Sequence, residues 1–360
     1  MGCAYRFLTV FFKPRPRALH PAASRFQSAE PPSAERVSET SKENLSAGDQ
    51  ARSKRSGRSR IQLDDQHYLH GYCRLRTCSN LLRVNRTRRA QRVWPPTKAR
   101  GGTKTNFQYP RVAVTDTQKE QFDREGYCIF ENVLSAAQLE MLREECLFLA
   151  DEIDREMTAA GETISGINHR GKRYFISKRH TDRPRLRDFL FSETMAEICR
   201  SLIGGDVWLF NEQFVVKSAA VGLPFSWHQD SGYIDSGCPH KPYLSLWCPL
   251  DDVDEENGTI YVLPFSRAEV TSRIDHATHV GSNDLVGYSG NEKGEPAIMS
   301  AGSIAAFSSV SFHRSGANTT NEARRIYLAQ YSLEPIIDPR NNRLWALATP
   351  FLKSGNRVTD

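Results

Sequence analysis

The sequence predicts a mainly β protein with a jelly-roll core, flanking α-helices and a disordered basic N-terminal extension. Three observations support this fold class. Amphipathic helical patterns come first, short β-rich runs separated by Gly, Pro, Asn and Asp follow, and the excess positive charge lies before residue 111. Helices followed by a row of short strands are typical of a sandwich or jelly-roll with helices packed on its outside.

Residues 1–110 are predicted to be a largely disordered extension. They contain 22 Lys and Arg against 7 Asp and Glu, so the net charge of +6 for the whole chain leaves −9 on the other 250 residues. Residues 29–62 are rich in Ser, Glu, Arg, Ala and Pro and bury too little apolar surface to offset chain entropy. We interpret this extension as a solvated or cleaved tail. The alternative is a contact for nucleic acid or an anionic membrane.

The compartment is predicted from three features. Residues 1–28 contain no acidic residue and several arginines among Phe, Leu and Val, which resembles an organelle presequence. The eight cysteines are scattered, which favours reduced thiols, and no apolar run reaches the length of a membrane span. Residues 357–360 do not form a peroxisomal Ser-Lys-Leu address. We expect an intracellular protein, cytoplasmic or, if residues 1–28 are a presequence, mitochondrial or otherwise organellar.

A folded domain is predicted over residues 115–335, followed by a C-terminal tail at 336–360. Thr115 and Ser135 are good N-caps for helices that run to about residues 122 and 157, and a third helix over 192–202 ends at Gly204-Gly205. Strands are expected from short β-rich runs between turn residues. They are residues 126–130, 207–210, 214–216, 243–249, 259–263, 303–307 and 325–332.

Three residues of the strand-rich half predict a metal centre. His228 and Asp230 form a His-x-Asp pair, and side chains two positions apart on an extended segment point to the same face. His313 follows 85 residues later, a separation that carries the chain around a double-stranded β-helix to a neighbouring strand. Two histidines and one carboxylate that leave positions open suit Fe(II), whereas closed zinc sites more often use four protein ligands and more sulfur.

Arg324 stands at the start of the expected strand 325–332, eleven residues after His313. A dicarboxylic keto acid bound to a metal leaves one carboxylate free, and a guanidinium binds such a group bidentately. Each residue alone has an ordinary explanation, because a lone histidine is more often structural and an arginine more often forms a surface salt bridge. The combination favours an iron site that depends on a keto acid.

Several longer motifs surround these residues. They are His228-Gln229-Asp230, Asn257-Gly258-Thr259 with Leu263-Pro264, His313-Arg314-Ser315-Gly316-Ala317-Asn318 followed by Arg324, and the opening Phe122…Gly126-Tyr127 with Val133-Leu134-Ser135. In this set of motifs the chain resembles the phytanoyl-CoA dioxygenase family over about residues 115–335. It departs from the usual pattern after Leu263-Pro264, where the family often has Gly-Ser-His, and in a long polar loop at 268–300.

The resemblance implies a double-stranded β-helix, cupin-like fold and Fe(II) held by His228, Asp230 and His313. It implies that 2-oxoglutarate chelates this iron and places its far carboxylate on Arg324, with a hydrogen bond from Ser315. O₂ is then the second cosubstrate, and ascorbate is a possible supporting reductant.

Three further residues are implied contacts of the cosubstrate. Trp247, in Leu246-Trp247-Cys248-Pro249, corresponds to a family tryptophan that lines the pocket, and Gln213 and Lys178 are additional candidates. The implied activity is that of an Fe(II)/2-oxoglutarate-dependent dioxygenase, in which 2-oxoglutarate is decarboxylated to succinate and CO₂ and a substrate is hydroxylated.

The expected substrate is a small organic or lipid-derived molecule. The alternative is a catalytically silent binding or regulatory protein that keeps the dioxygenase fold. A nucleic-acid partner is not expected, because the basic extension is the only feature that suggests one. His240, His276 and His279 lie in polar loops and are expected to be solvated. Substrate identity and oligomeric state do not follow from the sequence, because fold and triad do not encode them.

Overall fold

The computed structural model describes residues 112–358 of the chain. The predicted extension at 1–110 and the candidate presequence at 1–28 lie outside these residues. Within them, no helix is both long and apolar enough to cross a bilayer. The five cysteines of this part of the chain are buried and form no disulfide.

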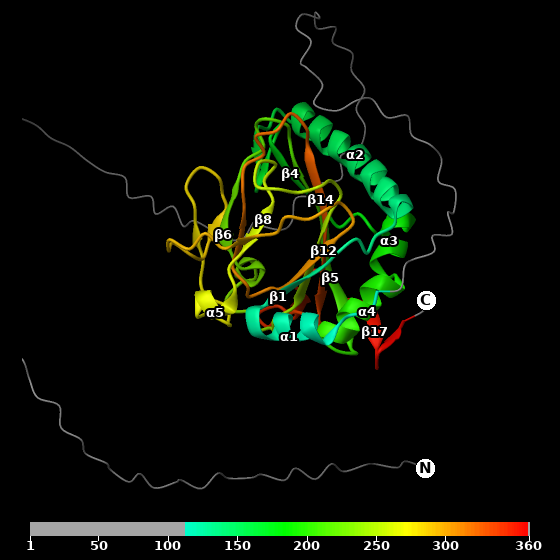
Figure 1. The fold of residues 1–360 in the computed structure, drawn as a ribbon. Helices are drawn as coiled ribbons and strands as arrows, with labels where there is room; N and C mark the ends of the chain where they lie inside the picture. The colour runs from blue at the N-terminus through cyan, green and yellow to red at the C-terminus, as the bar shows by residue number, and fades with distance from the viewer. Residues whose placement is uncertain (1–111, 359–360) are drawn as a thin grey trace, which may run out of the picture. The chain divides into compact units, whose positions relative to one another are not determined.

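Antiparallel strands dominate the described residues, with most of the helices before the central strands (Figure 1). The helices and the 3₁₀ turn are α1 (Asp116–Glu125), α2 (Ala136–Ala159), α3 (Pro184–Leu190), α4 (Glu193–Leu202), η1 (Asp230–Tyr233) and α5 (Phe265–Ala268). The strands are β1 (Tyr127–Phe130), β2 (Ile164–Ser165), β3 (Asn168–His169), β4 (Arg173–Ser177), β5 (Val207–Lys217), β6 (Phe225–His228), β7 (Leu244–Pro249), β8 (Ile260–Val262), β9 (Ala277–Thr278), β10 (Leu285–Val286), β11 (Glu295–Pro296), β12 (Ile304–Ser308), β13 (His313–Ser315), β14 (Arg324–Ser332), β15 (Ile337–Asp338), β16 (Arg343–Leu344), β17 (Thr349–Lys353) and β18 (Asn356–Arg357).

The three predicted helices are present as α1, α2 and α4. Thr115 and Ser135 each form a capping box, in which the side chain accepts from the backbone N–H three residues on and the glutamine at that position bonds back. Ser192 caps α4 by accepting from Met195. Gly126 ends α1 with a φ of +79°, a left-handed conformation in which glycine carries no Cβ penalty.

The larger sheet has ten strands, in the order β1-β12-β7-β14-β5-β4-β3-β2, with β17 also paired to β5 and β18 paired to β17. Helices α2, α3 and α4 lie on one side of its central strands, and β6 and β8 lie on the other (Figure 1). The helix-covered face is apolar: the Tyr327 ring lies 4.3 Å from that of Phe214 and 5.8 Å from that of Phe189 in α3, between centroids. Burial of this face against the helices fixes the position of the sheet.

The smaller sheet has the order β11-β8-β13-β6 and closes over the opposite face of the larger one. A second apolar core fills the space between the two sheets. Its buried members come from both sides and include Val215, Trp247 and Leu328 of the larger sheet and Ile260 and Val262 of β8. The mainly β, double-stranded β-helix fold with flanking helices is therefore confirmed, and the metal-site residues lie at this interior.

Two expected strands, 207–210 and 214–216, are one continuous strand, β5. The polar residues between them were expected to interrupt it. Glu212 does not interrupt it because its buried carboxylate accepts a hydrogen bond from the Tyr327 hydroxyl at 2.8 Å and lies 3.3 Å from Nδ1 of His180. A buried polar group with such partners is tolerated within a strand.

The expected C-terminal tail at 336–360 requires correction, because residues 337–357 contribute strands. β17 pairs with the beginning of β5, and Phe351 and Leu352 are buried. The Phe351 ring lies 5.3 Å from Phe191 and 5.3 Å from Tyr331. The segment is short and mixed in polarity, so its apolar pair was not recognised as a strand.

We predict that Phe351→Ala lowers the free energy of unfolding by about 3–5 kcal/mol, because it leaves a cavity in the main core. Val358→Ala is the control, since Val358 is 42% exposed and its change is expected to cost no more than about 0.5 kcal/mol. Urea unfolding followed by circular dichroism measures both. Equal midpoints for the two variants would show that the C-terminal strands are dispensable.

Candidate metal and cosubstrate site

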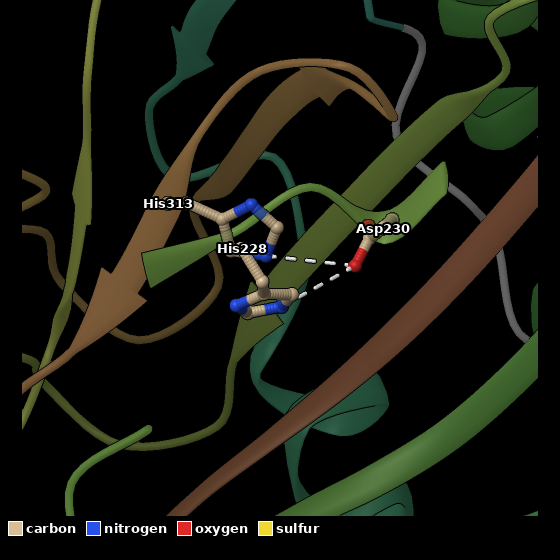
Figure 2. A group of neighbouring side chains, drawn as sticks. All are labelled: His228, Asp230 and His313. Carbon is tan, nitrogen blue, oxygen red and sulfur yellow. Dashed lines mark ion pairs between the residues drawn. The ribbon is translucent and has the colours of Figure 1, made fainter. Parts of the chain in front are cut away.

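The three predicted metal ligands converge. His228 ends β6, His313 begins β13, and the two residues are direct Cα partners across that antiparallel pair. Gln229 between His228 and Asp230 is extended, so Asp230 returns to the same face before η1 begins. Nε2 of His228 and of His313 lie 3.7 Å and 3.5 Å from Oδ1 of Asp230 (Figure 2). The ligand atoms of all three lie within 4.8 Å of one another.

Backbone carbonyls fix both imidazoles. Nδ1 of His228 lies 2.8 Å from the carbonyl oxygen of Ser226, and Nδ1 of His313 lies 3.1 Å from that of Ser311. A carbonyl can only accept, so each Nδ1 carries the proton and each Nε2 keeps its lone pair. The two lone pairs are therefore available to a metal ion beside Asp230.

The carboxylate of Asp230 is oriented by two side chains from the larger sheet. Its Oδ2 accepts from the Ser245 hydroxyl at 2.5 Å and from Nε2 of Gln330 at 2.9 Å. Nδ2 of Asn211 donates to the other end of Gln330 at 2.9 Å. These bonds occupy Oδ2 and direct Oδ1 toward the histidines, which is how outer contacts orient a metal ligand.

The charge states suit metal binding at neutral pH. Burial would raise the pKa of Asp230, but His313, His228 and the Ser245 hydrogen bond lower it to about 2. Burial and the neighbouring His228 lower the pKa of His313 to about 4. The carboxylate is thus ionised and His313 is neutral, the states in which both groups bind a metal.

Three cations lie side by side at one end of the larger sheet. Arg173 of β4, Lys217 of β5 and Arg324 of β14 are register partners across neighbouring strands, and all are at most 2% exposed. Arg173 forms an ion pair with buried Asp284 at 2.6 Å. Within the described residues Lys217 and Arg324 form no ion pair, and Lys217 donates to the Ser315 hydroxyl at 2.8 Å. The charge of Arg324 is therefore not compensated by a carboxylate of the described residues.

The guanidinium of Arg324 has capacity for an anion. Its Nη2 donates to the carbonyl of Gly258 at 2.8 Å, while buried Nε and Nη1 have no hydrogen-bond partner in the part of the chain that the structure describes. Burial lowers the pKa of Arg324 to about 10, so it stays charged at neutral pH. The Trp247 ring lies beside it, with 5.6 Å between the ring centroid and Cζ. Buried donors without partners are costly, so these atoms fit a carboxylate ligand.

The two other residues predicted to contact the cosubstrate, Gln213 and Lys178, lie at different places on the larger sheet. Gln213 is half-buried on β5 and is the register partner of Leu328. It lies four residues before Lys217 on the same strand, so both side chains point to the interior face. Lys178 is exposed and follows Ser177, at the opposite end of β4 from Arg173. The structure thus brings Arg173 rather than Lys178 to the cation row.

The sequence interpretation missed Lys217, Arg173, Ser245 and Gln330. Lys217 left only a weak signal, as a charged residue that closes the apolar run Phe214-Val215-Val216. Of the loop histidines expected to be solvated, His279 is exposed, but His240 and His276 are half-buried and hydrogen-bonded to Ser231 and Gln229. For these two the expectation was wrong.

Comparison with known proteins agrees with this geometry. The family model described as Phytanoyl-CoA dioxygenase (PhyH) matches residues 122–326, more than half of the chain. The protein belongs to the phytanoyl-CoA dioxygenase family. The match includes the three metal-site residues and Arg324, and it confirms the family resemblance drawn from the motifs.

Individual relatives are distant. The chain is 28% identical over 149 residues to the ectoine dioxygenase of Stutzerimonas stutzeri (strain A1501), which covers 41% of this chain and 48% of that protein. It is 22% identical over 258 residues to the phytanoyl-CoA dioxygenase domain-containing protein 1 of Danio rerio, covering 59% and 88%. The chain thus spans about half the length of the first relative and most of the second.

A solved structure supports the fold. EvdO2 from Micromonospora carbonacea var. aurantiaca, complexed with 2-oxoglutarate, superposes with a TM-score of 0.50 at 24% identity. The superposition covers 66% of this chain and all of that one. At this identity the likeness concerns the fold of the family domain.

We predict that the metal-free protein loses stability as pH falls from about 6.5 to about 4. Over that range the unfolded chain binds a proton at His313 that the folded chain does not, which amounts to about 3 kcal/mol. The shift of Asp230 acts only below its ordinary pKa of 3.8 and lies outside this window.

Urea unfolding with a chelator present, at several pH values, measures this loss. His313→Leu is the comparison, because it removes this proton and keeps the other histidines. A pH dependence of the same size in His313→Leu would contradict the assignment.

Proposed function

We propose that this protein is an Fe(II)/2-oxoglutarate-dependent dioxygenase that hydroxylates a small organic or lipid-derived substrate. In this proposal His228, Asp230 and His313 hold the iron, and Arg324 binds the far carboxylate of 2-oxoglutarate. Membership of the phytanoyl-CoA dioxygenase family supports the reaction class. Ectoine dioxygenase, among the relatives, supports the same class, although its substrate is not carried over.

One observation carries the proposal: the metal donors face the same interior as Nε and Nη1 of Arg324, which have no hydrogen-bond partner among the described residues. Ser315 follows His313 by two residues on β13, a rise of about 6.6 Å, and it contacts Lys217, the register partner of Arg324. A five-carbon dicarboxylate has a comparable length. One molecule can therefore reach the metal with one end and the cation row with the other.

The protein side chains then have separate tasks. Bound iron supplies O₂ activation, and the balanced reaction converts substrate C–H, O₂ and 2-oxoglutarate into substrate C–OH, succinate and CO₂. Arg324 and Ser315 orient the cosubstrate. The Trp247 ring packs beside the guanidinium, and Gln213 lies further along the interior face of β5. Lys217 donates a hydrogen bond to the Ser315 hydroxyl and so holds it in place, while burial and the neighbouring arginines keep the pKa of Lys217 well below the usual value.

The alternative of a catalytically silent protein has no specific observation in its favour. A silent relative needs no intact ligand set, yet here both histidine lone pairs and Oδ1 are oriented by their own hydrogen bonds. A buried guanidinium that has no carboxylate partner, and two donor atoms without hydrogen bonds among the described residues, also costs stability unless a ligand uses it. We therefore favour the enzyme.

Turnover tests the proposal directly. We expect purified protein with Fe(II), ascorbate and O₂ to convert 2-oxoglutarate to succinate, and a metabolite library to raise that rate when it contains the substrate. Asp230→Ala is the blank, because it removes an essential ligand while the histidines remain. Succinate formation at the same rate in this variant would refute the proposed iron site.

Arg324→Leu is expected to raise the KM for 2-oxoglutarate on the order of 100-fold, because it removes one partner of a buried charge pair. Arg325→Leu is the matched control, since Arg325 lies next in the strand and pairs with Asp251 instead. Steady-state succinate formation at varied 2-oxoglutarate measures both. An unchanged KM in Arg324→Leu would place the far carboxylate elsewhere.

A further inference from the structure

We infer that residues 272–276 of the long loop after α5 position the metal centre, with His276 as the principal positioning residue. This inference rests on the proposed function, because it concerns how the same iron ligands are held. We call these residues the clamp segment. They come from the region where the chain departs from the usual family pattern, and none of them forms a hydrogen bond with the side chain of a proposed metal ligand.

The clamp segment bonds to the residue between two metal ligands. The backbone N–H of Gln229 donates to Nε2 of His276 at 2.8 Å. The Gln229 side chain is fully buried: its amide donates to the carbonyl of Ser272 at 2.8 Å, and its oxygen accepts from the N–H of Ile274 at 2.9 Å. Three hydrogen bonds therefore fix Gln229, and through it the relative orientation of His228 and Asp230.

The same segment also holds the turn that follows Asp230. Nε of Arg273 donates to the carbonyl of Ser231 at 3.0 Å, and its Nη2 donates to that of Ile234 at 2.9 Å. These carbonyls belong to η1 and its C-cap; that of Ser231 also accepts the backbone N–H of Ile234 at 3.2 Å, so Arg273 adds a second bond to this turn. The clamp segment is thus hydrogen-bonded to the backbone on both sides of Asp230, at Gln229 and at Ser231.

The tautomer of His276 follows from its partners. Because the backbone N–H of Gln229 can only donate, Nε2 of His276 must accept, so its proton lies on Nδ1. That proton is donated to the carbonyl of Ile274 at 2.9 Å. The imidazole is consequently held in one orientation by a donor and an acceptor, as in metal-site outer contacts.

Two glycines form a slot for this ring. A Cβ placed on Gly232 would lie 2.4 Å from the His276 ring, and one placed on Gly287 would lie 2.5 Å from it. Neither glycine has a positive φ, so backbone conformation does not require glycine at these positions. The absence of a side chain at both places is explained by the room that His276 needs.

Gln229 is also hydrogen-bonded to the segment that precedes His313, the third proposed metal ligand. Nε2 of Gln229 also donates to the carbonyl of Val310 at 2.7 Å, on the approach to His313. Gln229 therefore joins the clamp segment, the His228–Asp230 pair and the β13 side of the centre. Loss of the His276 contact should loosen the ligand geometry while the sheets and helices remain intact.

The test measures metal affinity rather than turnover. Full-length wild type and His276→Leu are titrated anaerobically with Mn(II) in the presence of 2-oxoglutarate, by calorimetry. We expect the Kd for Mn(II) to rise about tenfold in His276→Leu, the lower range for lost outer contacts of a metal site. His276→Gln should restore most of the affinity, because its side-chain oxygen reaches the place of Nε2 and accepts from Gln229.

His279→Leu is the matched control, since His279 lies in the same loop, is exposed, and should leave the Kd unchanged. An unchanged Kd in His276→Leu, or equal losses in the Leu and Gln variants, would overturn the inference. If His276→Leu does not fold, Arg273→Leu replaces it, and an unchanged Kd there counts against the clamp. Failure of the proposed function is distinct, because wild type would then bind Mn(II) no better than Asp230→Ala.

Discussion

The site depends on the antiparallel pairing of β6 with β13. That pairing sets His228 directly opposite His313, and the extended Gln229 carries Asp230 back to the same face. Side chains alternate along a strand, so a slip of one residue would turn His313 and Ser315 away from the interior together. The metal donors and the first contact of the cation row therefore share one register.

Charge is distributed along this interior in a way that suits a bridging ligand. His313 is neutral and the one carboxylate is oriented toward the histidines, while Lys217 and Arg324 at the other end have no carboxylate partner among the described residues. Water screens charges poorly in a buried site, so an anion is favoured beside Arg324, and a bound metal cation would offset Asp230 and favour the anion's other end as well. Asp284 compensates only Arg173, which leaves the carboxylate of a cosubstrate as the natural partner of Arg324.

Much of the architecture was predictable because it leaves local signals. Capped amphipathic helices, the His-x-Asp pair and an arginine opening an apolar strand each have a physical signature in the sequence. Ser245, Gln330 and Lys217 have weak ones, since a polar residue inside an apolar strand shows its role only when the partner strand is known. His276 and the strand around Phe351 were misjudged because loop residues and short mixed segments acquire their contacts from the tertiary fold.

The most direct test of this account is the crystal structure of the protein with Mn(II) and 2-oxoglutarate, prepared without O₂. We predict Mn(II) bound by Nε2 of His228, Nε2 of His313 and Oδ1 of Asp230, with 2-oxoglutarate on the metal and its far carboxylate on Nε or Nη1 of Arg324. A metal bound without Asp230, or a 2-oxoglutarate molecule that leaves Arg324 without a partner, would contradict the central claim.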